Sequence, residues 1–169
     1  MDHSEILKQI ITLRKSTFPR EYSGNSIPKE ILDEILHAAA LAPNHKRTRP
    51  WRFKVFENNE KLALGRELQQ IYKNITPEFQ FLQKKYDDIL FKAEKAGAII
   101  TIVVEFSGLV PQWEEIAATA MAVQNMYLTC TAHEIGCYWS SPKLVNYLEK
   151  NVQIQENQKC LGLFFVGQL

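Results

Sequence analysis

The sequence is poor in the features that mark secreted, metal-binding and membrane proteins. Its 169 residues include three cysteines, an odd number with no C-x-x-C pair, so neither a disulfide framework nor a zinc site is expected. Cys130, Cys137 and Cys160 are interpreted as small core residues, because free cysteine is usually buried. No apolar run approaches the ~20 residues of a membrane span, and residues 1–16 mix charged with apolar side chains, unlike a signal peptide. We therefore expect a reducing, cytoplasmic location.

An excess of one charge is also lacking, as are the short motifs of several enzyme classes. Twenty basic residues nearly balance 19 acidic ones, and the net charge of +1 argues against a general nucleic-acid or membrane binder. The chain has no G-x-G-x-x-G or G-x-x-x-x-G-K-[ST] phosphate loop, no G-x-S-x-G nucleophile elbow and no H-E-x-x-H metal motif. We therefore predict neither a metal site nor a catalytic side chain.

Hydrophobic spacing predicts a single α+β domain over residues 1–169, which is α/β in the broad sense of helices around a small sheet. The continuous apolar run of residues 98–105 predicts a central strand covered on both faces. Shorter strands are expected at 53–56, 137–139 and 161–166. Helices are expected from the N-terminus to about residue 16, between Pro28 and Pro43, and over 60–72, 77–94 and 113–134, with Gly136 as the last C-cap and a short helix after Pro142.

The first candidate site is the tripeptide Arg14-Lys15-Ser16, at the end of the first predicted helix. A guanidinium, a flexible ammonium and a hydroxyl in succession suit a phosphate group. Cations at a helix C-terminus also complement the helix dipole. From the residues alone, a phosphate site and a purely structural charge cluster therefore both stay open.

The second candidate site is a basic loop, residues 43–53, which contains no acidic residue. Pro43 and Pro50 bracket the loop, and prolines reduce the entropy that is lost when a segment is ordered. A rigid cationic loop is a better pocket wall than a flexible one, although a solvated surface or a nucleic-acid patch is the alternative. Its basic side chains are those of His45, Lys46, Arg47, Arg49 and Arg52.

Four blocks of sequence stand in the same order as in a known enzyme family. They are Leu13 to Ser16, Ala42 to Phe53, Val110 to Glu115 and Gly136 to Ser141, and they extend over nearly the whole chain. With these blocks the chain resembles the FMN-dependent nitroreductases, above all their small members of the YdjA type. Each block is weak alone, but the set is specific.

The resemblance implies a nitroreductase-like fold, with a small, mostly antiparallel sheet surrounded by helices, in a homodimer that binds FMN at the subunit interface. It implies that Arg14, Lys15 and Ser16 contact the FMN phosphate, ribityl chain or pyrimidine edge. His45 would lie against the same cofactor, and Arg49 would reach the flavin from the partner subunit. The later loop would line the flavin with Trp139, Ser140 and Ser141.

The resemblance also implies a reaction in which NAD(P)H reduces FMN and an electron-poor acceptor, such as a nitroaromatic compound or a quinone, takes the reducing equivalents. Many family members carry a lysine two residues after the motif serine, where this chain has Phe18. Lys15, Arg47 and Arg49 are thus the candidates for the cation beside the flavin N1/O2 edge. Phe18 and the end of the chain at Leu169 motivate the alternative, a degenerate relative that binds flavin or a nucleotide without catalysis. No nucleic-acid or membrane partner is expected.

Overall fold

A computed structural model describes residues 2–148 and 150–169 of the chain. Its centre is a four-stranded sheet in the order β1-β2-β4-β3, and every neighbouring pair of strands is antiparallel. The predicted fold class, a small antiparallel sheet surrounded by helices, is confirmed. The strands are β1 (Trp51–Phe56), β2 (Ala98–Glu105), β3 (Ile135–Ser140) and β4 (Gln158–Gln168).

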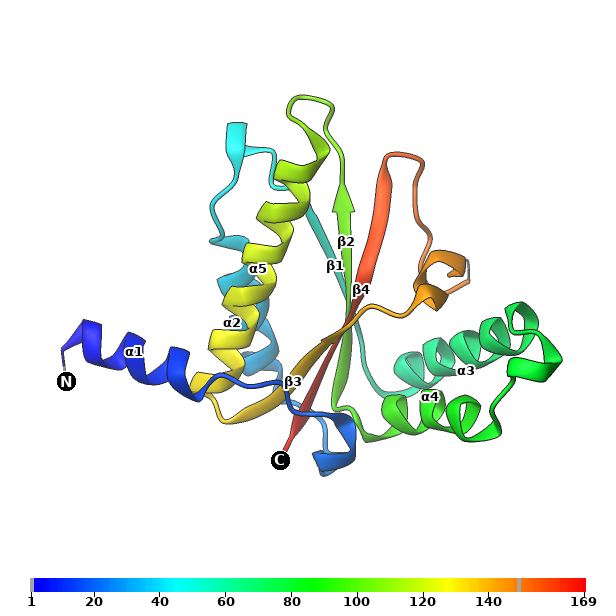
Figure 1. Ribbon diagram of the computed structural model, residues 1–169. Coiled ribbons are helices and arrows are strands. Elements are labelled where there is room, and N and C mark those ends of the chain that lie inside the picture. Colours follow the sequence, from blue (N-terminus) through cyan, green and yellow to red (C-terminus); the bar gives the residue numbers. More distant parts are fainter. Residues whose placement is uncertain (1, 149) are drawn as a thin grey trace.

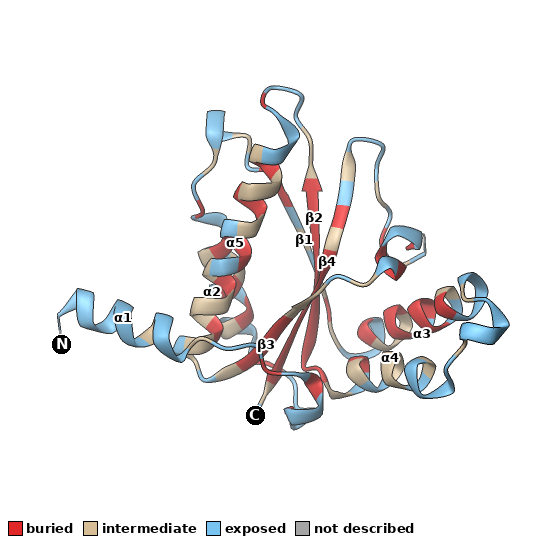
Figure 2. Ribbon diagram, in the orientation of Figure 1, coloured by how far each residue is buried: buried red, intermediate tan, exposed pale blue. Residues whose placement is uncertain are grey.

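Helices cover both faces of the sheet, as Figure 1 shows. α2 (Lys29–Ala40) and α5 (Gln112–Ala132) pack together on one face, and α3 (Asn58–Ile75) and α4 (Gln83–Lys95) pack together on the other. Strand β2 lies between these layers and is buried along nearly its whole length (Figure 2). Its alternate residues serve two cores, because Ile100 packs with α2 and α5 whereas Ile99 packs with α3 and α4.

The predicted helix over residues 77–94 is wrong in its first third. A short 3₁₀ turn, η3 (Glu78–Gln80), comes first, and the α-helix α4 begins only at Gln83. Phe79, which has the right spacing for the buried face, is 85% exposed, whereas Tyr86 packs against the core. The break is stabilised from outside the segment, since the backbone N–H of Leu82 donates to the hydroxyl of Tyr72 at 3.1 Å.

Helix α1 (His3–Leu13) stands away from the rest of the chain in Figure 1. None of its residues is buried. The helix ends at Leu13, three residues before the predicted end, so that Arg14 to Ser16 lie in an extended connection toward the sheet. Its apolar side chains Ile6, Leu7, Ile11 and Leu13 are exposed.

Tyr22 attaches this connection to strands β3 and β4. Its hydroxyl donates to the carbonyl oxygen of Thr17 at 2.6 Å, and its ring lies over two glycines. A Cβ on Gly136 would come within 2.7 Å of the ring, and one on Gly167 within 2.2 Å. The prediction that Gly136 caps α5 is therefore wrong: it lies inside β3 beneath Tyr22, and Glu134, with φ of 57°, adopts the left-handed conformation at the helix end.

Candidate functional site

Tyr127, on α5, contacts both the Arg14-Lys15-Ser16 segment and Trp139, the first residue of the predicted flavin-lining loop. The Arg14 guanidinium lies over the Tyr127 ring, 5.4 Å from its centroid. The Ser16 hydroxyl is 3.3 Å from the Tyr127 hydroxyl, which also accepts the backbone N–H of Trp139 at 2.7 Å. Sequence reasoning missed Tyr127, because its helical spacing fits a core residue. Lys15 is exposed beside this cluster.

The two faces of strand β3 put its last residues into different surroundings. Trp139 faces α5, and its indole N–H donates to the carbonyl oxygen of Leu161 at 3.1 Å. Ser140 points the other way, into a cavity of about 110 Å³ between β3 and α4. Ser141 is exposed at the end of the strand, just before η4 (Lys143–Tyr147). The charged side chains that line this cavity are Lys85, Asp88 and Lys92, of which the last two form an ion pair at 2.6 Å.

Tyr138 lines the same cavity and carries a buried hydroxyl that has no hydrogen-bond partner among the described residues. Burial raises the pKa of Tyr138 to about 12, and the nearby Ser140 hydroxyl acts in the opposite direction. Its ring stacks on Phe165 with centroids 5.1 Å apart. Phe18, which stands in place of the family lysine, also packs against this ring, with centroids 5.0 Å apart. An unpartnered buried phenol thus lies beside two of the predicted site residues.

The Tyr138→Phe variant should have the same free energy of unfolding at pH 7 as the native chain, or one higher by up to about 1 kcal/mol, because it removes an unsatisfied buried hydroxyl. The phenol ionises with a pKa of about 10 in the unfolded chain and of about 12 in the folded chain. The native protein therefore keeps its full stability below about pH 10 and loses part of it as the pH rises through the folded-state pKa. The variant should therefore lose less stability between these two pH values. Denaturant unfolding at several pH values checks this, with the exposed Tyr147→Phe as control; a markedly destabilised Tyr138→Phe at pH 7 would contradict it.

The basic loop is held against the N-terminal end of α5. His45 Nδ1 lies 2.6 Å from the Glu114 carboxylate, and Lys46 Nζ donates to the carbonyl oxygen of Leu109 at 3.0 Å. The backbone of the loop is strained, since three non-glycine residues have left-handed φ values between 44° and 55°. Such strain persists only where the surroundings fix it, and it concentrates at functional sites. The three residues are Lys46, Arg47 and Arg49.

A shallow cavity of about 320 Å³ lies next to the basic loop, between the loop and α5. Its wall includes His45 and the apolar residues Met121 and Trp113, and Trp113 is 68% exposed. A large exposed indole beside a cationic rim can receive a flat aromatic molecule. The sequence offered only an ambiguous signal that Trp113 lines a pocket, because a tryptophan in the first turn of a helix can equally pack on the hydrophobic core of its own chain.

The structure does not bring the two basic segments together within one chain. Tyr127, which contacts Arg14 and Ser16, and Glu114, which contacts His45, are 13 residues apart on α5. At 1.5 Å per residue the two contact points are roughly 20 Å apart along the helix. Arg14, Ser16 and Trp139 gather at Tyr127, whereas His45 lies at Glu114, near the opposite end of α5. The basic loop that carries Arg49 lies at that same end (Figure 1).

Residues 2–148 and 150–169 offer neither a metal site nor a membrane span. No group of three or more histidine, cysteine, aspartate or glutamate side chains there is placed to hold a metal ion. In the same residues, no helix combines the length and apolar character needed to cross a bilayer. The three cysteines are free and buried, as predicted.

Comparison with known proteins places this geometry in context. Residues 11–168 match the sequence model of the Nitroreductase family. The Escherichia coli K12 protein named "Putative NAD(P)H nitroreductase YdjA" is 29% identical over 146 residues, which cover 82% of this chain and 75% of that protein.

Solved structures of similar proteins share the fold. A nitroreductase-like family protein from Bacillus cereus superposes with a TM-score of 0.80 at 24% identity, over 100% of this chain and 88% of that one. The FMN-dependent nitroreductase NfnB from Mycobacterium smegmatis, solved in complex with NADPH, superposes with a TM-score of 0.79 at 15% identity, over 99% of this chain and 89% of that one.

Proposed function

Because the chain belongs to the nitroreductase family, we propose that it is an FMN-dependent oxidoreductase that passes reducing equivalents from NAD(P)H through the flavin to an electron-poor acceptor, such as a nitroaromatic compound or a quinone. The observation that carries the proposal is the cluster of Arg14, Ser16, Tyr127 and Trp139, which joins a phosphate-binding type of segment to the end of strand β3. The names of relatives support it, since they describe NAD(P)H nitroreductases and FMN-dependent enzymes.

The residues at this cluster fit FMN in their chemistry. The phosphate dianion needs cations and hydroxyl donors, which Arg14, Lys15 and Ser16 offer on an accessible segment. The edge of the flavin ring carries carbonyl oxygens and nitrogens, and Ser141, which is exposed at the end of strand β3, offers a hydroxyl donor for that edge. The Arg14 to Ser16 segment therefore matches the charge of the FMN phosphate, and Ser141 would serve the polar edge of the ring.

A homodimer with FMN between the subunits completes this site. One chain holds its two basic groups roughly 20 Å apart on α5, so His45 and Arg49 would approach the flavin of the second copy rather than their own. The cavity formed by His45, Met121 and Trp113 would then lie over that flavin and receive the acceptor. The exposed apolar face of α1 supports association, because its side chains would be covered in a dimer.

Bound FMN would supply the hydride chemistry, and the protein would bind, orient and polarise it. Arg14 and Ser16 would hold the phosphate, and Trp139 would orient the flavin ring against strand β3. A cation near N1/O2 stabilises the negative charge of reduced flavin. The candidates for that cation are Lys15, Arg47 and Arg49. No side chain needs to act as nucleophile or base.

The test is to add FMN to the purified protein, measure binding by flavin fluorescence, and add NADPH or NADH without oxygen. We expect the protein to bind FMN and one or both nicotinamides to bleach the flavin absorbance, which a nitroaromatic or quinone then restores. A protein that binds no FMN would refute the proposal. Bound flavin that neither nicotinamide reduces would instead favour the alternative, a flavin-binding protein without catalytic activity.

A further inference from the structure

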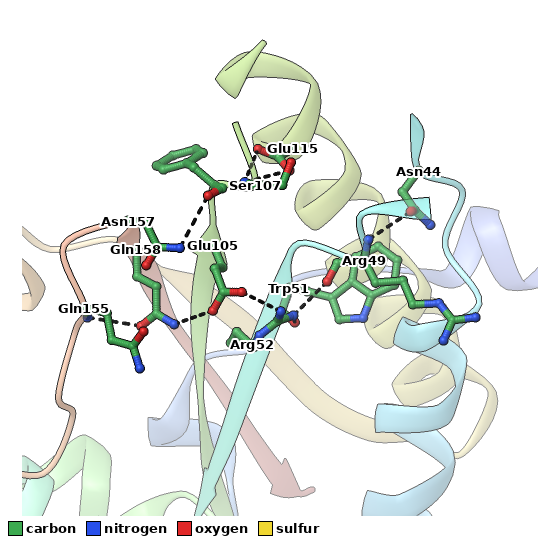
Figure 3. Close-up of polar contacts among 11 residues, drawn as sticks. Asn44, Arg49, Trp51, Arg52, Glu105, Ser107, Glu115, Gln155, Asn157 and Gln158 are labelled. Atoms are coloured by element: carbon green, nitrogen blue, oxygen red, sulfur yellow. Dashed lines mark hydrogen bonds and ion pairs between the residues drawn. The ribbon is translucent and has the colours of Figure 1, made fainter. Parts of the chain in front are cut away.

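The backbone of Arg49 is held from both sides by side chains of its own chain. Its N–H donates to the Asn44 side-chain oxygen at 2.9 Å, and its carbonyl oxygen accepts from Nη1 of Arg52 at 2.7 Å (Figure 3). Between these two bonds Arg49 has a φ of 44°, in the left-handed region that L-residues avoid. The two hydrogen bonds therefore fix a conformation that the residue would not adopt alone, while its own side chain stays exposed.

Arg52 is itself fixed in place by the neighbouring strands. Its Nη1 also donates to the carbonyl oxygen of Trp51 at 2.8 Å, and its Nη2 pairs with Glu105 of β2 at 2.7 Å. The other oxygen of Glu105 accepts from the Gln158 side chain of β4 at 2.7 Å. The hydrogen bond from Gln158, and to a smaller extent the contact with Arg52, hold the pKa of Glu105 below its usual range, so the carboxylate stays charged at neutral pH. Figure 3 shows this series of polar contacts, which leads from Arg49 in the basic loop to Gln158 in β4.

The Arg52 side chain lies on a different face of the sheet from the cluster that would hold FMN. In strand β1 the side chain of Trp51 packs with α2 and α5, so that of its neighbour Arg52 points to the opposite face. Its guanidinium is occupied by two carbonyl oxygens and a carboxylate. Arg52 thus binds the backbone of the loop, whereas Arg49, three residues earlier, carries the exposed guanidinium.

We propose that Arg52, anchored by Glu105 and Gln158, is a positioning residue that fixes the left-handed backbone of Arg49 and so aims the Arg49 guanidinium at the flavin of the second subunit. This inference rests on the proposed function. Without Arg52, the Arg49 carbonyl loses its charged donor and the backbone relaxes to a negative φ. The Arg49 side chain then leaves from a different direction, although its charge is unchanged.

A double-mutant cycle on FMN affinity separates this role from a direct contact. Arg49→Ala should weaken FMN binding by about tenfold, and Arg52→Met by about fivefold in the native background but less than about twofold in the Arg49→Ala background. Arg52→Lys should not restore affinity, because one ammonium cannot reach two carbonyls and a carboxylate together. Arg66→Met, at an exposed position of helix α3, is the matched control and should leave affinity unchanged.

Trypsin cleavage of the flavin-free protein tests the same role independently of the cofactor. Lys46 and Arg47 are cleavage sites in the basic loop, and Arg52→Met should speed cleavage there about fivefold, whereas Arg66→Met should not. An unchanged cleavage rate, or an equal loss of FMN affinity in both backgrounds, would overturn the positioning role while leaving the proposed function intact. A native protein that binds no FMN would overturn the proposed function and the inference with it.

Discussion

Arg14→Met should weaken FMN binding by about 30- to 100-fold, the largest loss that we expect from any single side chain. A charge-assisted bond to a phosphate contributes about 2 to 3 kcal/mol, and each 1.4 kcal/mol is tenfold in affinity. The Arg14 guanidinium is accessible and already rests on the Tyr127 ring. Little conformational entropy therefore remains to be lost on binding. Titration of FMN fluorescence at fixed ionic strength measures the change.

The matched control for this prediction is Arg20→Met, at an exposed arginine of the same N-terminal connection, in η1 (Pro19–Glu21). It should leave the FMN affinity within about twofold, since an exposed cation without a direct contact is screened by salt. The affinity of the native chain should also fall more steeply with salt than that of Arg14→Met. Equal losses in the two variants would mean that only the overall positive charge of this segment matters, and not the Arg14 contact.

The elements that could be predicted from the sequence are those whose apolar pattern matches their final surroundings. Residues 98–105 form β2 with both predicted ends, because a run of β-branched residues has few alternatives to a strand buried on both faces. The pattern over residues 77–94 failed because its core contacts come from two conformations: Phe81 packs just after the 3₁₀ turn, whereas Tyr86 and Ile89 pack from α4. Phe79 has the same spacing and no core to contact. Periodicity shows which residues could share a face, whereas the tertiary fold decides whether that face is covered.

The candidate site was predictable only in part, for a related reason. Arg14 to Ser16 and the basic loop stand out as local concentrations of charge, which a linear reading can detect. Tyr127 does not, because a tyrosine among apolar residues on a helix is indistinguishable from a core residue until its hydroxyl is seen to accept from Trp139. The separation of the two basic groups along α5 depends on packing between distant segments. It is also the feature on which the proposed two-subunit flavin site depends.

Gly167→Ala should lower the free energy of unfolding by about 3 kcal/mol, which corresponds to a fall of roughly 6 to 12 °C in Tm for a chain of this length. The new Cβ would lie 2.2 Å from the Tyr22 ring, closer than any relaxed contact. Tyr22 can move only by giving up its bond to the carbonyl oxygen of Thr17. The Thr17 N–H in turn donates to the carbonyl oxygen of Cys137 at 2.9 Å, on β3. Displacing Tyr22 therefore loosens the connection that carries Arg14.

Gly24→Ala is the control, since Gly24 lies near Tyr22 in sequence but has no atom within 4 Å of the added Cβ. Its φ of 89° makes alanine strained there, so a loss of about 1 kcal/mol is expected from the backbone alone. Thermal unfolding compares the two variants, and FMN titration at a temperature where both are folded should show weaker binding for Gly167→Ala only. Equal losses of stability, or unchanged FMN affinity in Gly167→Ala, would mean that Tyr22 does not hold the Arg14 segment in place.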